Sequence, residues 1–520
     1  MTGGEIFVEC LKAQGVKAIF GMPGNHLNAV YESLYKNRDT IRHYVARHEG
    51  GAAFMADGYA RATGDVGVCV TVPGPGATNA STGICEAYTA CSPVLLITGQ
   101  NPPHLTKKDP SKSFHGLDQA AAFAPMTKHI EIVQEVHEIP NAVNRTFGAL
   151  RSGRPGPALI ELSSEALTAE ADLPIPPRNN GIRPAASPSD IQEALDLIRR
   201  SKRPFILAGG GVNHTRATAE LIEFAALLDA PVATTGMGKG AMPEDSPHSL
   251  RVLHNSSTRV AMEQSDLLIA VGTRFTYRDT GNWSLEIKQP LLHIEADANE
   301  INKEYPATVG IGADPKIVLQ QLNAALKKEK FQSSWGTQLA ELRRQVENAE
   351  RPRIIEELRA AMPRDAILSV DVHITGYSAL PNFTVYESGT YIFSGISVTM
   401  GIGLPAAIGA QVAHPNRKVV ALCGDGGFLM NSPDLATAVK YNLPIVTIVM
   451  NDNKLTSIEG GQVNRFGATL GINLVNPDFV KFAESFGAIG LRVEDEVEFK
   501  PAIEKALTLD KPSVIEVVKS

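Results

Sequence analysis

The sequence has little tryptophan, little cysteine and no large excess of charge. Its 520 residues include two Trp and five Cys, and the formal net charge is -7. Charges of both signs are dispersed along the chain and leave no basic footprint, so we expect no nucleic-acid partner. No two cysteines form a CxxC pair. An odd, sparse set in a long chain is typical of reduced thiols in the cytoplasm and argues against a disulfide framework.

The sequence also lacks a clear export or membrane segment. Residues 1–13 carry charged side chains and no apolar core, so we expect no secretory signal. One uncharged run, residues 391–414, has the length of a membrane span, but four glycines and Pro405 interrupt it. We interpret this run as a glycine-rich loop followed by a buried helix, and we expect no membrane partner.

The composition and length that are present fit a multidomain globular protein. Hydrophobic residues make up 43% of the chain and charged residues 20%, which are ordinary values. At about 150 residues per domain, the length predicts about three domains. A proline-rich segment at 172–190 and a charged segment at 327–353 mark two boundaries. We therefore predict domains at residues 1–170, 188–326 and 352–520.

Short apolar runs alternate with stretches of helical length and pattern in all three blocks. Strands are expected at residues 18–22, 43–46, 67–72, 94–98, 205–208, 231–234, 267–271, 291–294, 367–370, 419–423 and 445–450. Helices are expected at residues 27–35, 50–62 and 79–90. This alternation predicts an α/β protein with three doubly wound parallel sheets, in which ligands bind beyond the carboxyl ends of the strands.

The expected strand at 419–423 ends in Gly-Asp-Gly-Gly, which places Asp425 among three glycines. Most such triplets are tight turns. Here a helix, capped by Ser432 with Pro433 at its first position, leads to the next strand, and a second carboxylate, Asp452, follows that strand. Glycines let backbone N–H groups approach an anion, and carboxylates with a carbonyl suit Mg²⁺. The unit therefore predicts a diphosphate–Mg²⁺ site, and it lacks the Lys-Ser/Thr of a P-loop NTPase.

The unit resembles the cofactor signature of thiamin diphosphate-dependent enzymes, in which Gly-Asp-Gly is followed at a fixed spacing by an Asn-Asn or similar pair at a strand end. The resemblance implies that Asp425, Asp452 and the carbonyl of Lys454 bind Mg²⁺, with Asn453 as an alternative ligand. Diphosphate contacts would come from three glycines: Gly424, Gly426 and Gly427. The family usually has Asn where this chain has Asp452, and the added negative charge should tighten the dependence on Mg²⁺.

A second part of such a site is expected far away in the sequence. Glu49 lies at a strand-to-helix junction among small and apolar residues. A carboxylate there is poorly solvated, which suits proton exchange with the aminopyrimidine ring of the cofactor. By itself, Glu49 is equally typical of a helix start. The surrounding segment, RHEGGAAFMADGYARATG, resembles the glutamate segment of the family and favours the catalytic role.

The resemblance extends over essentially the whole chain. The segments FGMPGNH, VPGPGATNA and PVLLITGQ are similar to the pyrimidine-binding domain of acetolactate synthase-like enzymes, and Pro73 and Asn79 there are implied cofactor contacts. TTGMGKGAMPEDSPHSL and SDLLIAVGTRF are similar to their middle domain, and TMGIGLPAAIGAQ to the segment that leads into the cofactor motif. The three blocks would then be pyrimidine-binding, middle and diphosphate-binding domains.

The segment before the Gly-Asp-Gly motif is implied to shape the cofactor. A bulky apolar side chain props the cofactor into a bent form in this family. The resemblance gives that role to Met400, with ordinary core packing as the alternative. The carbonyl of Val398 would accept a hydrogen bond from the aminopyrimidine. A preceding strand end also contacts the cofactor in the family, which here implicates Asp371, His373 and Thr375.

The substrate pocket departs from the family pattern. SKSFHGLDQAAAFAPMTKH is similar to an acetolactate synthase segment with a Phe-Gln pair, which here falls on Phe114 and His115. A histidine can carry a proton near neutral pH, although an ordinary loop histidine is the alternative. Asn25 and His26 are further candidates, with helix capping as their alternative role. Biosynthetic acetolactate synthases carry a Trp near the position of Gly461, so we expect a larger or differently polar pocket, and 2-acetolactate is doubtful as the product.

The resemblance implies an enzyme that decarboxylates a 2-oxo acid, with or without carboligation. A simple decarboxylase of the benzoylformate type is the alternative. A 2-hydroxyacyl-CoA lyase and a non-catalytic nucleotide-binding relative are less favoured, the latter because Glu49 is retained. Thiamin diphosphate and Mg²⁺ are the expected cofactors, whereas the glycine-rich residues 208–213 neither indicate nor exclude FAD. The two halves of the site lie on different domains, so the resemblance implies a homodimer or a dimer of dimers with shared sites.

Overall fold

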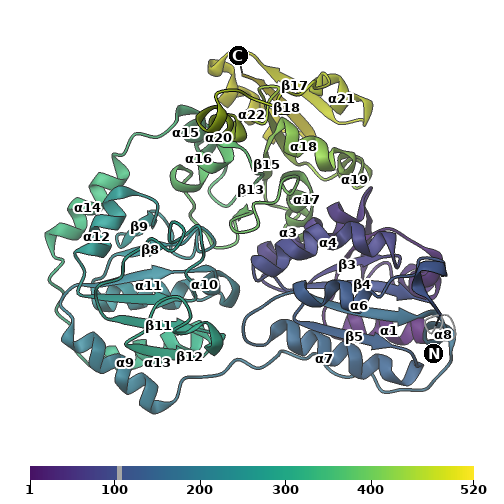
Figure 1. Ribbon diagram of the computed structural model, residues 1–520, viewed down its shortest axis with the longest axis horizontal. Coiled ribbons are helices and arrows are strands. Elements are labelled where there is room, and N and C mark those ends of the chain that lie inside the picture. The colour runs from purple at the N-terminus through teal and green to yellow at the C-terminus, as the bar shows by residue number, and fades with distance from the viewer. Residues whose placement is uncertain (102–107, 520) are drawn as a thin grey trace. The chain divides into compact units, whose positions relative to one another are not determined.

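The chain forms three six-stranded sheets with helices packed against them (Figure 1). The structure is a computed structural model that describes residues 1–101 and 108–519. Every strand pair with a described register is parallel, which confirms the predicted α/β class. The chain divides into two compact units. The first combines Met1–Ile182, Ile367–Ile374 and Ser397–Ser520, and the second combines Arg183–Ala366 and Thr375–Ile396.

The N-terminal sheet of the first unit has the strand order β2-β1-β3-β4-β6-β5. Its strands are β1 (Ala18–Gly21), β2 (Arg42–Val45), β3 (Gly67–Thr71), β4 (Val94–Gln100), β5 (His129–Val133) and β6 (Ala158–Ser163). The helices of this part include α1 (Gly3–Ala13), α2 (Asn28–Lys36), α3 (Glu49–Thr63), α4 (Pro75–Thr89), α6 (Gln119–Phe123) and α7 (Ile139–Arg151). The four strands and three helices expected here are present, whereas β5 and β6 were not anticipated.

The C-terminal part of the first unit carries the Gly-Asp-Gly-Gly motif. Five strands of its six-stranded sheet belong to this unit, in the order β13 (Ile367–Val370), β15 (Val419–Gly424), β16 (Val446–Asn451), β18 (Ser513–Val518) and β17 (Ile489–Val493). Its helices include α17 (Gly403–Ala413), α18 (Asp425–Asn431), α19 (Leu435–Lys440), α20 (Thr456–Phe466), α21 (Phe479–Ser485) and α22 (Phe499–Leu507). Because β15 and β16 are direct parallel neighbours, the residues that follow them meet at one edge of the sheet.

The helix after the motif begins earlier than predicted. We expected the cap at Ser432, but α18 starts at Asp425, directly after β15, with Gly424 as its extended N-cap residue. A carboxylate in the first turn favours a helix start there. A short 3₁₀ turn, Ser432–Asp434, then connects α18 to α19 and contains the proline that had suggested a helix start.

The second unit contains the middle sheet, with the strand order β12-β11-β10-β7-β8-β9. Its strands are β7 (Pro204–Ala208), β8 (Val232–Thr234), β9 (Ser249–Val252), β10 (Leu267–Val271), β11 (Leu291–Glu295) and β12 (Val309–Gly312), and β14 (Tyr391–Phe393) belongs to the same unit. Helices of this unit include α9 (Pro188–Arg200), α11 (Thr218–Leu228), α13 (Pro315–Leu326), α14 (Thr337–Glu347), α15 (Arg353–Ala361) and α16 (Ile374–Asn382). The expected surface helix in the charged segment 327–353 is α14, which buries Leu339, Leu342 and Val346 beside Trp335.

The uncharged run at residues 391–414 forms a short strand, a loop and the buried helix α17, as predicted from its glycines. No helix among the described residues combines the length and the apolar character needed to cross a membrane.

Helices α3 and α17 cross in close backbone contact within the first unit. A Cβ atom on Gly58 of α3 would lie 2.2 Å from the carbonyl oxygen of Ala406. A Cβ atom on Gly409 of α17 would lie 1.9 Å from the carbonyl oxygen of Met55. Side chains cannot be inserted at such distances without moving backbone. Glycine at these two positions therefore lets α17 support α3, the helix that begins with Glu49.

Substitution Gly409→Ala is expected to lower the free energy of unfolding by about 1–3 kcal/mol, because the methyl group forces the two helices apart. Thermal unfolding of the full chain measures the change. Gly460→Ala on α20 is the matched control, since nothing lies within 4 Å of its Cβ position. An equal effect of both substitutions would show that the crossing does not depend on glycine.

Candidate active site

The first part of the candidate site lies where β15 and β16 end. Asp425 is 3% exposed, and its Oδ2 accepts a hydrogen bond of 2.7 Å from the Asn476 side chain. Burial raises the pKa of Asp425, the N–H of Gly426 and the side chain of Asn476 lower it, and the nearby charge of Asp452 raises it again. Two carboxylates that repel each other at one sheet edge are the environment that a divalent cation would stabilise.

The second carboxylate also organises the turn after β16. Asp452 Oδ1 accepts from the N–H of Lys454 at 3.1 Å, and Oδ2 accepts from the Thr456 hydroxyl at 2.6 Å. Asn453 adopts a left-handed conformation with φ 56°. Among the described residues, no group of three or more His, Cys, Asp or Glu side chains could hold a metal ion. A cation here would need the Lys454 carbonyl and ligand oxygens beside the two carboxylates.

The glycines of the motif lie against the other predicted cofactor residues. A Cβ atom on Gly424 would lie 2.8 Å from Cβ of His373, and one on Gly427 would lie 2.8 Å from Oδ1 of Asp371. A Cβ atom on Gly426 would lie 3.6 Å from Cε of Met400. The structure therefore brings two segments, residues 371–373 and Met400, to the glycine turn that follows β15. A side chain on Gly424 or Gly427 would collide with residues 371–373, and the N–H of Gly426 donates to Asp425 Oδ1 at 2.8 Å.

Asp371 holds the loop that leads into α17. Its carboxylate is 1% exposed and accepts from the N–H groups of Val372, Gly401 and Gly403 at 2.6, 3.0 and 3.1 Å. Burial raises the pKa of Asp371 to about 6, against the effect of these three donors. Its carboxylate hydrogen bonds are thus with backbone N–H groups, two of them where this loop joins α17.

The other two residues predicted after β13, His373 and Thr375, belong to different units. Burial lowers the pKa of His373 to about 3, so this ring is neutral at pH 7. Thr375 is buried and belongs to the second unit, at the start of α16.

The loop at 397–400 is fixed in a strained conformation. Val398 has φ 54°, a region that β-branched residues rarely adopt. The residues on either side are tied to α4: Ser397 pairs with the Thr89 hydroxyl at 2.6 Å, and the Thr399 hydroxyl donates to Glu86 at 2.9 Å. Strain of this kind persists only where the surroundings impose it, and it concentrates at functional sites. The carbonyl of Val398 and the side chain of Met400 are therefore presented by a preorganised loop.

Glu49 occupies the first position of α3 and is 7% exposed. The His48 side chain caps the helix by accepting from the N–H of Gly50 at 3.0 Å. Oε2 of Glu49 accepts from the Asn79 side chain at 3.0 Å, and a Cβ atom on Gly76 would lie 3.2 Å from Oε1. Asn79, predicted as a cofactor contact, thus orients Glu49.

Three aromatic rings stack at the predicted substrate side. The ring centroids of Phe114 and His115 are 3.9 Å apart, and His26 lies 5.3 Å from His115 and 5.7 Å from Phe114. His26 Nε2 pairs with Asn101 Oδ1 at 3.3 Å, and burial lowers the pKa of His26. Helix α2 has no side-chain cap, so neither Asn25 nor His26 has the alternative capping role. Asn25 is exposed and starts a short 3₁₀ turn.

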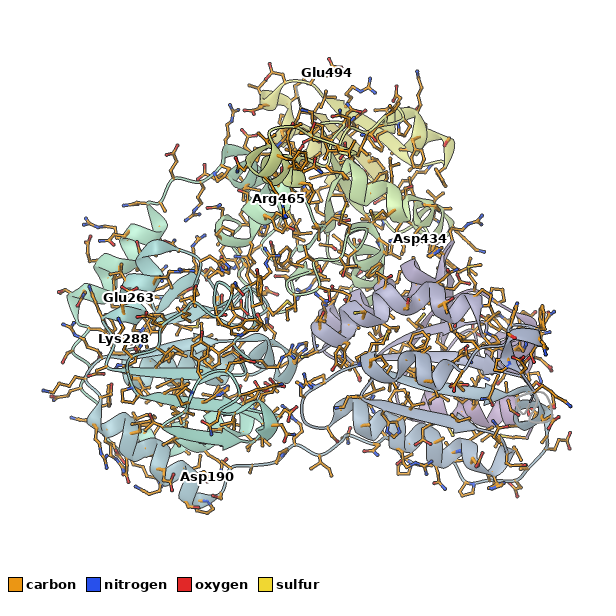
Figure 2. The ribbon with its side chains drawn as sticks, in the orientation of Figure 1. Asp190, Glu263, Lys288, Asp434, Arg465 and Glu494 are labelled. Atoms are coloured by element: carbon orange, nitrogen blue, oxygen red, sulfur yellow. The ribbon has the colours of Figure 1, made fainter. Side chains whose placement is uncertain are left out.

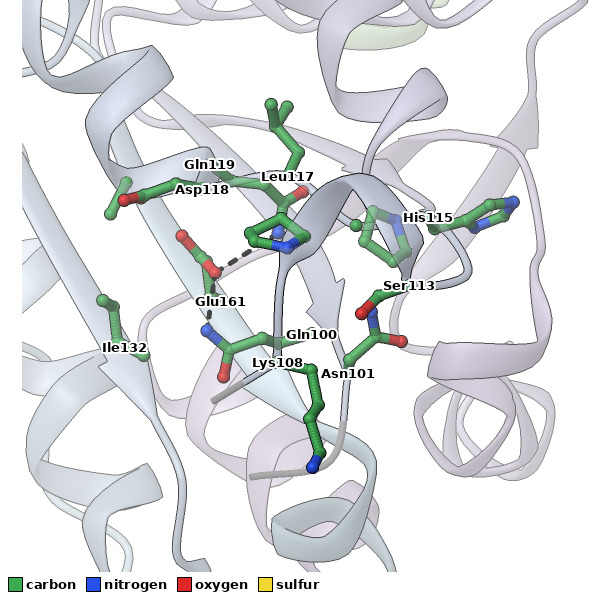
Figure 3. A pocket seen from close by; sticks show the side chains of 14 residues that line it. Gln100, Asn101, Lys108, Ser113, His115, Leu117, Asp118, Gln119, Ile132 and Glu161 are labelled. Atoms are coloured by element: carbon green, nitrogen blue, oxygen red, sulfur yellow. Dashed lines mark hydrogen bonds between the residues drawn. The ribbon is translucent and has the colours of Figure 1, made fainter. Parts of the chain in front are cut away.

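A pocket of about 170 Å³ adjoins His115 and Pro73 (Figure 3). Its floor is polar and buried: Oε2 of Glu161 accepts from Gln100 at 2.9 Å and from Gln119 at 3.2 Å. Burial raises the pKa of Glu161 to about 7, while the two amide donors lower it. Oε1 of Gln119 accepts from the Thr98 hydroxyl and from the N–H of Gly74. The floor of the pocket is therefore hydrogen-bonded to the turn after β3.

Sequence reasoning missed several of these residues. Glu161 lies on β6, a strand that the sequence pattern did not predict, and Gln119 lies in the segment for which the resemblance implied Phe114 and His115. Asn476, which donates to Asp425 and to Asn451, stands in a loop without a motif. The local signal here is the Asn-Pro pair before Asp478, the N-cap of α21. It indicates the start of a helix and does not indicate a ligand.

The glycine turn, the loop at 397–400 and Glu49 all lie in parts of the chain that match models of thiamine pyrophosphate enzymes. Family models for thiamine pyrophosphate enzymes match three parts of the chain: the N-terminal TPP binding domain at residues 1–122, the central domain at 191–322 and the C-terminal TPP binding domain at 375–517. The chain belongs to the thiamin diphosphate-dependent enzymes of the acetolactate synthase-like group.

Relatives of this group match the chain along its length. A probable acetolactate synthase large subunit of Methanocaldococcus jannaschii is 37% identical over 100% of this chain and 92% of its own length. The acetolactate synthase isozyme 2 large subunit of Escherichia coli is 33% identical over 99% of this chain and 95% of its own length. The acetolactate synthase large subunit of Haemophilus influenzae is 31% identical over 98% and 92%.

Proposed function

We propose that this enzyme uses thiamin diphosphate and Mg²⁺ to decarboxylate a 2-oxo acid. The acyl fragment keeps the electron pair of the broken C–C bond, and it is then either transferred to a second carbonyl compound or protonated and released as an aldehyde. The observation that carries the proposal is the convergence of Asp371, Met400 and the two carboxylates on one glycine turn. A structural turn would not require a strained Val398 beside it.

Different residues of the chain would hold the two ends of the cofactor. Asp425, Asp452 and the Lys454 carbonyl would hold Mg²⁺, and the N–H groups of the glycine turn would face the diphosphate. Val398 and Met400 would position the aminopyrimidine end, with Glu49 exchanging a proton there. When bound, the cofactor supplies the carbon nucleophile that adds to the 2-oxo group and takes up the electron pair left by carbon dioxide.

The product that forms after decarboxylation depends on the polar residues around the predicted substrate pocket. His26 and His115 stack next to a pocket that ends on Glu161. Histidines can deliver a proton to the reacting carbon, which releases an aldehyde, or they can orient a second carbonyl compound, which gives a carboligation product. The names of the relatives favour carboligation as acetolactate synthases perform it. The histidine pair keeps simple decarboxylation as the second candidate.

Product analysis separates the two outcomes. The holoenzyme is supplied with pyruvate or phenylglyoxylate, and the products are identified by NMR. A hydroxyketone or acetolactate-type product supports the synthase-like reaction, and free aldehyde with carbon dioxide supports the simple decarboxylase. If neither acid is consumed while thiamin diphosphate is bound, these two acids are not the substrates and a wider panel of 2-oxo acids is required.

We also propose a homodimer or a dimer of dimers in the cytoplasm, in which Glu49 from one chain serves cofactor held by another. The support is the family resemblance and the placement of Glu49 and Asp425 on different sheets of the chain. Light scattering of the holoenzyme gives the mass. Mixed oligomers of Glu49→Gln and Asp425→Ala chains should recover part of the activity that each lacks alone, because one hybrid site is intact.

A further inference from the structure

The segment that leads from β2 into Glu49 is held by side chains from the C-terminal part of the same unit. The Val45 N–H donates to the Tyr441 hydroxyl at 2.9 Å, and the Thr437 hydroxyl donates to the Val45 carbonyl at 2.8 Å. The Arg47 N–H donates to Asp434 Oδ1 at 2.7 Å. Val45, the last residue of β2, and Arg47, the residue before the helix cap His48, are thus held by α19, by its C-cap residue and by the turn before it.

Asp434 also touches the first turn of α3. Its side chain is labelled in Figure 2, in the 3₁₀ turn before α19, and the residue is 1% exposed. A Cβ atom on Gly51, the third residue of α3, would lie 1.7 Å from Asp434 Oδ2. Only glycine leaves room for the carboxyl group at this distance. A carboxylate at the N-terminal end of a helix is also favoured by the helix dipole.

The Asp434 carboxyl group forms one hydrogen bond with the backbone before Glu49 and packs against Gly51 with its second oxygen. Oδ1 is used by Arg47, while Oδ2 has no hydrogen-bond partner among the described residues. Burial raises the pKa of Asp434 to about 7, and the N–H of Arg47, the Thr437 hydroxyl and the Arg47 charge lower it. A buried, partly unsatisfied carboxyl group is costly, and replacing it would be favourable if it served stability alone.

We propose that Asp434 is a positioning residue for Glu49: its carboxyl group fixes the start of α3 and so sets the direction of the Glu49 side chain. Asn79 already holds the carboxylate end of the Glu49 side chain by a hydrogen bond. The direction of the side chain then depends on the position of its backbone at the start of α3. This proposal rests on the catalytic role of Glu49 stated above. It makes Gly51 the steric partner of Asp434.

Single variants test the acceptor role. Asp434→Asn keeps an oxygen for the Arg47 N–H and is expected to stay within about fivefold of the wild-type kcat, whereas Asp434→Ala is expected to lose about 100-fold, the usual cost of misplacing a catalytic group by about 1 Å. KM should stay within about twofold in both, because the substrate contacts are elsewhere. Leu342→Ala, in the second unit, is the control for general destabilisation and should leave kcat unchanged at a temperature below its unfolding.

A double-mutant cycle tests the contact with Gly51. Gly51→Ala alone should lower kcat about as much as Asp434→Ala, because its methyl group collides with the carboxyl group. In the Asp434→Ala background the same methyl group enters vacated space, so the second substitution should cost less than about threefold more. Additive losses, or an Asp434→Asn variant as slow as Asp434→Ala, would overturn the proposal.

Hydrogen exchange separates a failure of this proposal from a failure of the proposed function. Amides of residues 46–52 should exchange at least tenfold faster in Asp434→Ala than in the wild type, and near the wild-type rate in Asp434→Asn. If exchange behaves so but no Asp434 variant changes turnover, Asp434 orders the helix start without positioning Glu49, and the proposal is wrong. The proposed function fails only if Glu49→Gln also turns over at the wild-type rate. If exchange of residues 46–52 is unchanged in Asp434→Ala, the positioning role itself is wrong.

Discussion

Replacing Glu49 by glutamine is expected to lower turnover by about 100-fold to 10,000-fold, the range that a positioned proton-transfer group contributes. Glutamine has the shape of glutamate, and its amide oxygen can still accept from the Asn79 side chain as Glu49 does at 3.0 Å. What it loses is the ability to exchange a proton with the cofactor. Glu49 is the first residue of α3 and is 7% exposed, so few water molecules reach this position to exchange the proton instead.

The loss should occur without loss of cofactor. Thiamin diphosphate retained after desalting is measured for the wild type and for Glu49→Gln, alongside steady-state turnover. Glu9→Gln is a matched control, because Glu9 forms a partly exposed ion pair with Lys12 on α1. Unchanged turnover in Glu49→Gln would contradict the role of Glu49 as the proton-exchange group.

Replacing Asp425 by alanine is expected to abolish Mg²⁺-dependent retention of thiamin diphosphate, with a loss of affinity of about 100-fold or more. The substitution removes one of the two carboxylates at the ends of β15 and β16, and it leaves the Asn476 side chain without its 2.7 Å acceptor. Asp452→Asn keeps an oxygen ligand and should retain the cofactor at raised Mg²⁺ concentration. Asp425→Ala removes both a ligand and a negative charge, whereas Asp452→Asn removes only a negative charge. The two variants therefore distinguish the effect of the charge from the effect of the number of ligands.

Cofactor retention is measured by desalting in a chelator and again with Mg²⁺ restored. The wild type should lose cofactor in the chelator and regain it with Mg²⁺, whereas Asp425→Ala should regain none. Asp495→Asn, at the start of a surface turn, is a control that should behave as the wild type. If Asp425→Ala holds cofactor in the chelator, the metal-ligand role given to this residue is wrong.

The sheets and the shared edge at which Asp425 and Asp452 follow their strands could be predicted because local patterns determine them. Apolar runs bounded by glycine and proline mark strands such as β3 and β15, and parallel sheets place ligands beyond the ends of such strands. The two carboxylates then meet because β15 and β16 are neighbours. The family resemblance supplied the distant Glu49, which no spacing argument could have connected to Asp425.

What the sequence could not supply depends on contacts between distant segments. The conformation of Val398 opposes the local preference of a β-branched residue and is imposed through its neighbours by Glu86 and Thr89. In the sequence, Gly51 is one of several small residues at a helix start. Its contact with Asp434 becomes visible only in the structure. The early start of α18 was missed because Pro433 is a stronger local signal than the glycine cap before Asp425.

The most direct measurement is the release of carbon dioxide from a panel of 2-oxo acids by the holoenzyme, with thiamin diphosphate and Mg²⁺ present or with Mg²⁺ chelated. We expect at least one acid to be decarboxylated in a Mg²⁺-dependent way, and we expect Glu49→Gln to release carbon dioxide at least about 100-fold more slowly from that acid. Carbon dioxide release that is equal in the two proteins, or absent for every acid while cofactor is bound, would contradict the proposed function.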